Sequence, residues 1–243
     1  MLESPGGLID VEASVDAAAG KATHIKLRNQ PAFVEKLGAL VKDVPTVGDV
    51  AIDIAFGGMW YAVVPAASVG LDLSPANARE LCRVGELIKA AAKLQHPVAH
   101  PTLDYPGPDI LAWTGPAATE ATAPGQVRRR NAVVMSNGEL DFNDPSTWTA
   151  MLDRSPCGTG TCAVMAVMHA KGELQVGQEF VHESIIGTEF VGQLESEETG
   201  PDGRTLVRPT IKGQAWITLE GTVVLDATDP FPRGYTLGDI WSQ

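Results

Sequence analysis

The strongest constraint on the fold is a predicted helix that is apolar on every side. The stretch Asp153-Arg-Ser-Pro-Cys-Gly-Thr-Gly-Thr161 leads into residues 162–170, which are nearly all small or apolar, and Lys171 and Gly172 follow. This order predicts a loop, a helix and a glycine stop. Because apolar side chains cover its whole circumference, the helix should be buried on all sides, with its N-terminus opening inside the protein.

Cys157 stands at the start of this helix, where the first backbone N–H groups have no partner within the helix. Such a turn carries about half a positive charge and suits a carboxylate. Gly158 and Gly160 would let a ligand approach the backbone closely. The same field should lower the pKa of the Cys157 thiol and make it a usable base near neutral pH. The pattern therefore indicates removal of a proton next to a bound carboxylate, as on an amino or hydroxy acid.

Two assignments stay open on the residues alone. Cys157 could instead be a buried structural thiol, although the proline before it and the glycines after it favour a functional role. Asp153 could pair with a substrate ammonium group or cap the helix. Cys162 lies about 140° around the helix from Cys157, and Cys82 lies on the apolar stripe of another helix, so both are expected to be packing residues.

The rest of the chain is predicted to be mostly β, with two or three helices. Residues 8–15 and 21–27 predict a hairpin, and Gly57 and Gly58 predict a tight turn between strands 47–54 and 60–65. Ser74 followed by Pro75 predicts the start of an amphipathic helix that reaches Leu94. Further strands are predicted at residues 110–113, 132–135, 179–186, 205–211, 214–219 and 223–226.

Charge and cysteine usage narrow the classes of partner. A formal net charge of −12 repels nucleic acid and anionic membrane surfaces, and the basic run at residues 128–130 is expected to be a solvated loop. No stretch approaches the roughly 18 apolar residues that span a bilayer and no signal peptide is evident, so a cytoplasmic location is expected. The three cysteines lack metal-ligand spacing, and His96 and His100 are expected to be ordinary loop histidines, so no metal site is expected.

Three segments resemble one known family. Residues 153–161, Asp53-Ile-Ala-Phe-Gly-Gly58 and Phe180-Val-His-Glu-Ser-Ile-Ile-Gly-Thr188 are similar to signatures of the proline racemase and hydroxyproline epimerase family, in the family's order. The resemblance covers essentially the whole chain. It implies an α/β (α+β) fold of the diaminopimelate-epimerase-like type, with two pseudo-symmetric β-rich domains that each surround a central helix.

The resemblance also implies roles for the site residues. The substrate would lie between two helix N-termini, with Asp153 on its ring amine, the Gly158 and Thr159 amides on its carboxylate, and Cys157 as one of two opposed acid/base thiols. Its substrate would be a small molecule, proline or hydroxyproline. Neither an organic cofactor nor a metal is implied.

One family signature is absent, the Met-Cys-Gly-His type of motif that carries the first thiol. Because residues 2–33 resemble the segment that normally follows it, the first domain is expected to be incomplete. Residues 1–36 and 212–243 would be its remnant, and residues 37–211 would be the second domain with the Cys157 motif. An apolar face left open in this way indicates association, as in a homodimer.

The resemblance favours a cofactor-independent racemase or epimerase of proline-like amino acids, above all a 4-hydroxyproline 2-epimerase. One alternative is a trans-3-hydroxy-L-proline dehydratase, although that branch of the family typically has threonine where Cys157 stands. The other alternative is a truncated, non-catalytic family member, since one fixed thiol cannot normally serve both faces of a stereocentre.

Overall fold

Fourteen strands and two α-helices make up the part of the chain that the computed structural model describes, residues 1–4 and 7–234. The strands are β1 (Leu2–Ser4), β2 (Gly7–Asp16), β3 (Lys21–Arg28), β4 (Phe33–Val44), β5 (Gly48–Phe56), β6 (Trp60–Pro65), β7 (Val98–Ala99), β8 (Pro106–Gly107), β9 (Ile110–Pro116), β10 (Val127–Ser136), β11 (Ala150–Leu152), β12 (Glu179–Glu183), β13 (Glu189–Thr199) and β14 (Thr205–Gly213). The helices are α1 (Ala78–Gln95) and α2 (Gly158–Ala170). Neither described helix has the length and apolar character needed to cross a membrane.

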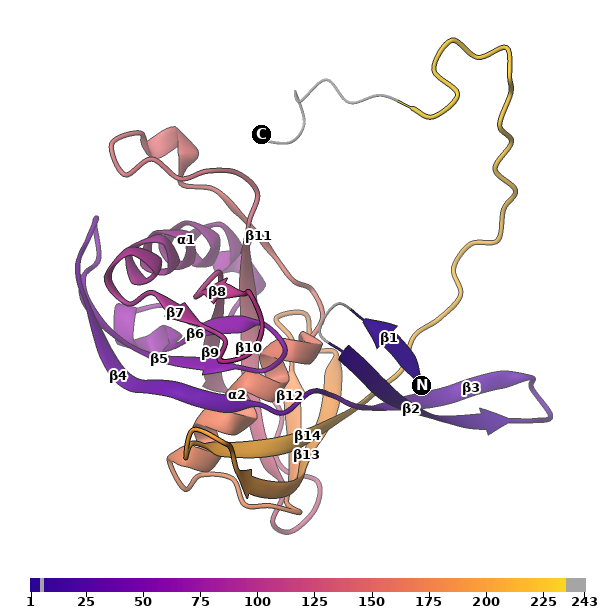
Figure 1. Cartoon of the computed structure of the whole chain (residues 1–243), viewed down its shortest axis with the longest axis horizontal. Helices are drawn as coiled ribbons and strands as arrows, with labels where there is room; N and C mark the ends of the chain where they lie inside the picture. The colour runs from indigo at the N-terminus through magenta and orange to yellow at the C-terminus, as the bar shows by residue number, and fades with distance from the viewer. Residues whose placement is uncertain (5–6, 235–243) are drawn as a thin grey trace.

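Most of the strands join one mixed sheet. Its order is β1-β2-β3-β14-β13-β12-β10-β9-β6-β5-β4, with β11 paired to β10, and β7 and β8 form a separate small ribbon. The β2–β3 hairpin is attached to the rest of the sheet through β14 and projects to one side (Figure 1). The mostly β architecture with few helices is therefore confirmed.

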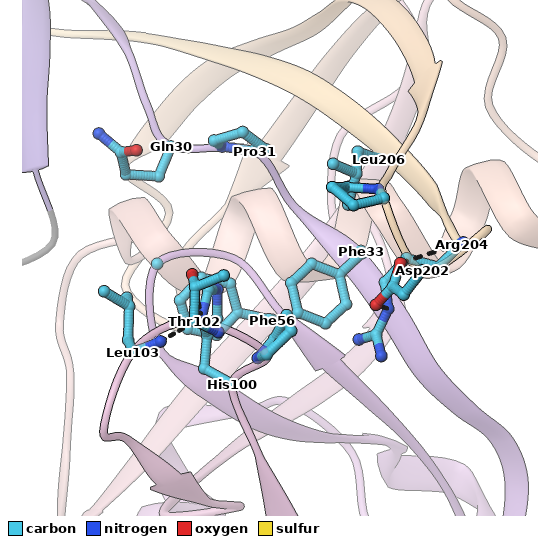
Figure 2. A pocket seen from close by; sticks show the side chains of 13 residues that line it. Gln30, Pro31, Phe33, Phe56, His100, Thr102, Leu103, Asp202, Arg204 and Leu206 are labelled. Carbon is cyan, nitrogen blue, oxygen red and sulfur yellow. Dashed lines mark hydrogen bonds and ion pairs between the residues drawn. The ribbon is translucent and has the colours of Figure 1, made fainter.

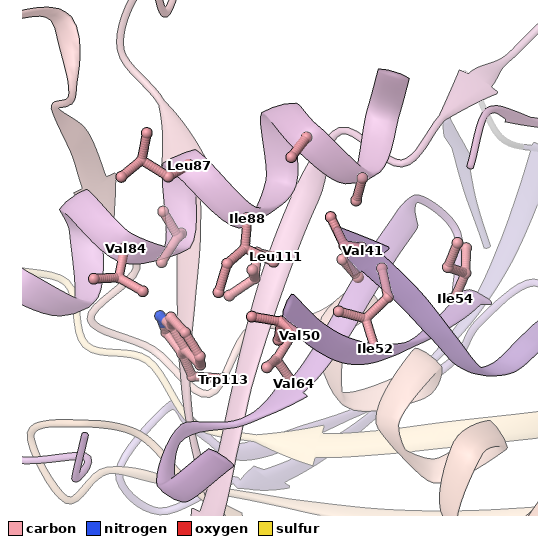
Figure 3. Packing of buried hydrophobic residues seen from close by; sticks show 14 of the residues in the cluster. Val41, Val50, Ile52, Ile54, Val64, Val84, Leu87, Ile88, Leu111 and Trp113 are labelled. Atoms are coloured by element: carbon pink, nitrogen blue, oxygen red, sulfur yellow. The ribbon is translucent and has the colours of Figure 1, made fainter. Parts of the chain in front are cut away.

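The two helices lie on opposite faces of strands β5, β6, β9 and β10. Because successive residues of a strand point to opposite sides, each of these strands contributes side chains to both cores. In β6, Trp60 and Val64 belong to the core beneath α1, whereas Tyr61 and Val63 belong to the core around α2. Figure 3 shows the first of these cores, in which Val84 and Ile88 of α1 face Val50, Val64, Leu111 and Trp113 of the sheet. The alternation in β6 thus directs Tyr61 toward α2.

The helix α2 is enclosed on all sides, as its sequence predicts. Its residues 160–168 are all buried, and β4, β5, β6, β13 and β14 contact it. Gly172 has a φ of 74° and donates its N–H to the His169 carbonyl (2.9 Å), which confirms the glycine stop. Beyond the helix, Lys171 pairs with the buried carboxylate of Asp53 (2.5 Å). The helix is therefore held at a fixed position within the sheet.

Several local predictions are confirmed and others are wrong. The N-terminal hairpin, the glycine-turn hairpin and the amphipathic helix are all present, and the Ser74 hydroxyl caps the turn that leads into α1. Residues 214–219 and 223–226 form no strand: Ile217 is 84% exposed and Val223 is 88% exposed. A strand needs a hydrogen-bonded partner strand for its N–H and C=O groups, and in the described part of the chain neither segment is paired with one. Strands β4 and β13 were not predicted.

The basic run at residues 128–130 was also predicted wrongly, because it lies in β10 rather than in a solvated loop. The Arg128 side chain is only 7% exposed and pairs with Glu183 (2.9 Å) and with Glu189. The Ala118 amide and the Thr119 amide also donate to Glu183, at 2.8 and 3.2 Å. Arg128 and Glu183 therefore form a buried ion pair that joins β10 to β12.

Stability should depend on the ionisation of Glu183. Burial raises the pKa of Glu183, but hydrogen bonds from Thr119, Arg128 and the backbone outweigh burial and lower it from 4.5 to about 2. A lowered pKa means that the carboxylate stabilises the fold above about pH 4.5, and that this contribution is lost as the pH falls toward 2. In urea unfolding, Glu183→Gln should be less stable than wild type at pH 6, with a gap that narrows by pH 2.5. An equal gap at both pH values would contradict this.

Candidate active site

The first turn of α2 rests on the tight turn between β5 and β6. A methyl group on Gly57 would lie 2.3 Å from the Thr159 carbonyl oxygen and 2.4 Å from the Ala163 nitrogen, both of them backbone atoms. A methyl group on Gly58 would lie 2.7 Å from the Thr159 methyl. The Asn29 amide nitrogen donates to the Gly57 carbonyl (3.3 Å) and so fixes this turn. The glycine pair thus forms the predicted tight turn and also lets this turn approach α2 closely.

Cys157 is the N-cap residue of α2, and its backbone is strained. Its φ of 61° and ψ of 125° lie in a region that residues with side chains rarely adopt. Two hydroxyls hold it there: the Ser155 Oγ accepts from the Cys157 N–H (3.0 Å), and the Thr161 hydroxyl donates to the Cys157 carbonyl (2.6 Å). Strain of this kind is concentrated at functional sites, where the surrounding structure fixes one geometry.

A buried polar cluster lies behind Cys157. The Asn131 amide nitrogen donates to the Pro156 carbonyl (2.7 Å), and His182 Nδ1 lies 2.9 Å from the Thr161 hydroxyl. The Thr161 hydroxyl also lies 2.6 Å from the Cys157 carbonyl and 3.1 Å from the Pro156 carbonyl. Burial lowers the pKa of His182 to about 3, so its ring is neutral. Asn131 and His182 therefore hold the strained loop in place through Pro156 and Thr161.

The Cys157 sulfur contacts two hydroxyl groups. It lies 3.3 Å from the Tyr61 hydroxyl and 4.0 Å from the Thr159 hydroxyl, and these two oxygens are 2.6 Å apart. Burial raises the pKa of Cys157, while hydrogen bonds from Tyr61 and from the Gly160 amide act in the opposite direction. The predicted lowering of this pKa is therefore wrong, because removing the sulfur from water outweighs the donors around it.

Asp153 does not cap α2. Its Oδ1 accepts from the Ser155 N–H (2.8 Å) within the loop, and the N-cap of α2 is Cys157. Among the described residues, no Lys, Arg or His pairs with the Asp153 carboxylate. The carboxylate therefore has an acceptor position left for an incoming cation.

The amides of Gly158 and Thr159 begin the helix. Within residues 1–4 and 7–234, neither N–H donates to a backbone or side-chain acceptor. A methyl group on Gly158 would meet no atom within 4 Å, so a ligand has access to this turn. Two free N–H groups at the positive end of a buried helix can bind a carboxylate. Cys157, Asp153, Gly158 and Thr159 thus lie together in the loop and first turn of α2.

The other two cysteines do not share this position. Cys162 is fully buried, accepts from Asn29 (3.3 Å), and burial raises its pKa to about 12. Cys82 lies in α1, and burial raises its pKa as well. In the part of the chain that the structure describes, no three His, Cys, Asp or Glu side chains gather as a metal ion would require.

Gly58 also lines a separate cavity of about 550 Å³, shown in Figure 2. Its walls include the rings of Phe33, Phe56 and His100, with Arg204 near one end. The His100 ring lies 4.5 Å from the Phe56 ring, and burial lowers the pKa of His100. This histidine lies in a loop, as expected, and is half-buried. Neither Cys157 nor Asp153 lines the cavity.

Sequence reasoning missed four residues around Cys157: Tyr61, Asn131, Thr161 and His182. His182 lies within the 180–188 signature, but nothing in that segment indicates that its side chain supports Cys157. The available signal for Tyr61 was the period-two alternation that follows the glycine pair, which places Tyr61 and Trp60 on opposite faces. The sequence alone did not indicate which of these faces belongs to α2.

Residues 1–236 match the family model described as proline racemase. The chain belongs to the proline racemase family. A 4-hydroxyproline 2-epimerase from Streptosporangium roseum is 40% identical over 238 residues, which are 97% of this chain and 65% of that relative. The three segments that resemble the family's signatures therefore reflect membership, and the chain spans slightly less than two thirds of the length of that relative.

Two solved structures of the proline racemase family share this fold. The hydroxyproline epimerase from Agrobacterium vitis, with bound trans-4-hydroxy-L-proline, has a TM-score of 0.81 and 32% identity, and the match covers 100% of this chain and 63% of that one. The probable proline racemase from Agrobacterium radiobacter K84, with bound carbonate, has a TM-score of 0.80 and 31% identity, with 98% and 64% coverage. The mixed α/β fold predicted for this family member is confirmed.

Proposed function

We propose that this chain carries one wall of the active site of a cofactor-independent racemase or epimerase of proline-like amino acids, with 4-hydroxyproline as the favoured substrate. One observation carries the proposal: the Cys157 thiol lies on the first turn of a buried helix, beside two free amides and the Asp153 carboxylate. The similarity to 4-hydroxyproline 2-epimerase supports this choice of substrate.

The proposed reaction uses each of these groups once. The Gly158 and Thr159 amides bind the substrate carboxylate, and Asp153 binds the ring ammonium group, which together orient the α-carbon toward Cys157. The Cys157 thiolate removes the α-proton and becomes a thiol, and the negative charge passes to the carboxylate, where the amides stabilise it. The reverse step returns a proton from the thiol to the same face of the substrate.

Inversion needs a second acid/base group on the opposite face of the substrate. Among the described residues, neither Cys82 nor Cys162 is placed to supply it, since Cys162 is fully buried and Cys82 belongs to α1.

We propose that residues 1–36 and 212–243 belong to the first domain of the family and residues 37–211 to the second; residues 235–243 lie outside the described part of the chain. Exposed apolar side chains such as Leu8, Val15 and Ile217 lie in the proposed first-domain segments and support this division.

The proposal predicts proton exchange without inversion. When the protein is incubated with trans-4-hydroxy-L-proline in D2O, the α-proton signal in the NMR spectrum should disappear while the configuration at the α-carbon is kept. Proline and trans-3-hydroxy-L-proline should be tested in parallel, and Cys82→Ser should leave the rate unchanged. Absence of exchange with all three would favour a non-catalytic family member, and elimination of water from 3-hydroxyproline would favour the dehydratase.

A further inference from the structure

Tyr61 is fully buried in β6 and reaches the Cys157 thiol from the sheet. Its hydroxyl lies between two groups, 3.3 Å from the Cys157 sulfur and 2.6 Å from the Thr159 hydroxyl. Gly160 makes room for this contact, since a methyl group there would lie 3.2 Å from the sulfur and 3.3 Å from the Tyr61 ring. The three groups form a short chain, from sulfur to phenol to threonine hydroxyl.

Each hydroxyl in this chain has one proton and can donate to one neighbour at a time. Burial and the nearby Cys157 raise the pKa of Tyr61 well above its ordinary value, so the phenol keeps its proton. When Cys157 is a thiolate, Tyr61 must donate to the sulfur and Thr159 can donate to Tyr61. When Cys157 is a thiol, the S–H can donate to Tyr61, and Tyr61 can turn to donate to Thr159.

We propose that Tyr61 is a positioning residue that sets the acid strength of Cys157, through a hydroxyl chain with Thr159 that reverses direction each time the thiol gains or loses a proton. The tuning of the thiol stands on the geometry alone, whereas its use in moving an α-proton rests on the proposed function. No proton leaves the chain during the reversal, because the α-proton passes only between carbon and sulfur while the two hydroxyls rotate.

The other groups that face Cys157 do not replace this chain. The Asp153 charge opposes the thiolate, and Cys162 stays a neutral thiol with its pKa raised to about 12. His182 is neutral and reaches Cys157 only through Thr161. The Gly160 amide does stabilise the thiolate, but it is fixed by the helix and cannot reverse. Tyr61 is therefore the donor at the sulfur that can adapt to both protonation states.

The test measures the pKa of Cys157 directly. The full chain is alkylated with iodoacetamide at pH values from 6 to 11, and mass spectrometry of the peptide that contains Cys157 gives the rate at this residue, with the Cys82 peptide as an internal reference. In Tyr61→Phe the apparent pKa should rise by about one unit or more, which is about tenfold in rate at pH 7. Thr159→Val should raise it by less, and Thr159→Ser should restore the wild-type value.

Tyr105→Phe is the matched control, because it removes a hydroxyl that donates to the Asp109 carboxylate (2.8 Å) rather than to Cys157. An unchanged Cys157 pKa in Tyr61→Phe, or an equal shift in Tyr105→Phe, would overturn the proposal. If Tyr61→Phe does not fold by circular dichroism, equal values in Thr159→Val and Thr159→Ser would overturn it.

Proton exchange of trans-4-hydroxy-L-proline is measured on the same samples and keeps the two proposals apart. A shifted pKa without exchange in the wild type would support the role of Tyr61 while the proposed function fails. Exchange without a shifted pKa would support the function and overturn the role of Tyr61.

Discussion

Substituting Cys157 with serine is expected to slow exchange of the substrate α-proton by about 10²- to 10⁴-fold, the usual contribution of one general acid/base group. Serine keeps the size of the side chain and can still occupy the strained N-cap position, but its hydroxyl is a much weaker acid than a thiol and supplies almost no anionic base. The amides of Gly158 and Thr159 and the carboxylate of Asp153 remain in place. Binding should therefore survive while exchange is lost.

The measurement is the NMR rate of α-deuteration of trans-4-hydroxy-L-proline in wild type and Cys157→Ser. Isothermal titration of the same ligand shows whether binding is kept. Cys82→Ser is the control, since its thiol lies in α1 and should not affect the rate. If Cys157→Ser exchanges the proton as fast as wild type, the base is another group and the assignment of Cys157 is wrong.

Replacing Gly57 with alanine is expected to destabilise the fold by about 1–3 kcal/mol or more, as overpacked cores do. The added methyl group would lie 2.3 Å from the Thr159 carbonyl oxygen and 2.4 Å from the Ala163 nitrogen. These two atoms are four residues apart in α2 and are hydrogen-bonding partners in an α-helix. Neither can rotate away like a side chain, so α2 must shift or lose this bond, and Cys157 would move with it.

Urea unfolding followed by circular dichroism gives the change in free energy, and the exchange rate in the folded variant gives the effect on the site. Gly115→Ala is a suitable control, because a methyl group there meets only the flexible end of the Leu73 side chain, at 3.1 Å. Equal stability of Gly57→Ala and Gly115→Ala would show that the β5–β6 turn can move away from α2 without loss.

The features predicted well from the sequence are those set by local chemistry. The apolar circumference of residues 162–170 predicts a buried helix, and the helix is buried. Ser74 and Pro75 likewise predict the beginning of the other helix, α1. The grouping of Cys157 with Asp153, Gly158 and Thr159 follows from their closeness in the chain, since a loop and one helical turn fix them relative to one another.

The features predicted badly depend on distant partners. Strand β4 contains register shifts against β5, and its mixed polar and apolar residues hide the alternation. Strand β13 is rich in glutamate and half exposed, yet it is held between β12 and β14. Residues 214–219 have strand-like side chains but pair with no strand in the described part of the chain. Strand propensity describes the fit to a sheet, and sequence does not show whether the sheet is there.

The pKa of Cys157 was also predicted wrongly because it depends on distant parts of the chain. Its position at the start of a helix argues for a lowered pKa, but burial raises it, and burial is a property of the whole fold. Tyr61, whose hydrogen bond opposes the effect of burial on this pKa, is separated from Cys157 by 96 residues in sequence. No local pattern could have joined these two residues.

The placement of β14 between β3 and β13 has a consequence for the order of folding during synthesis. Residues 21–28 leave the ribosome long before residues 205–213, the strand that joins them to the sheet. Ala32 likewise stays unpaired until Val207 is made, because these two residues exchange two backbone hydrogen bonds (2.9 and 2.8 Å). Until then the outer edge of β3 and the edge of β13 are both unpaired, which is the state in which nascent β proteins aggregate or bind chaperones.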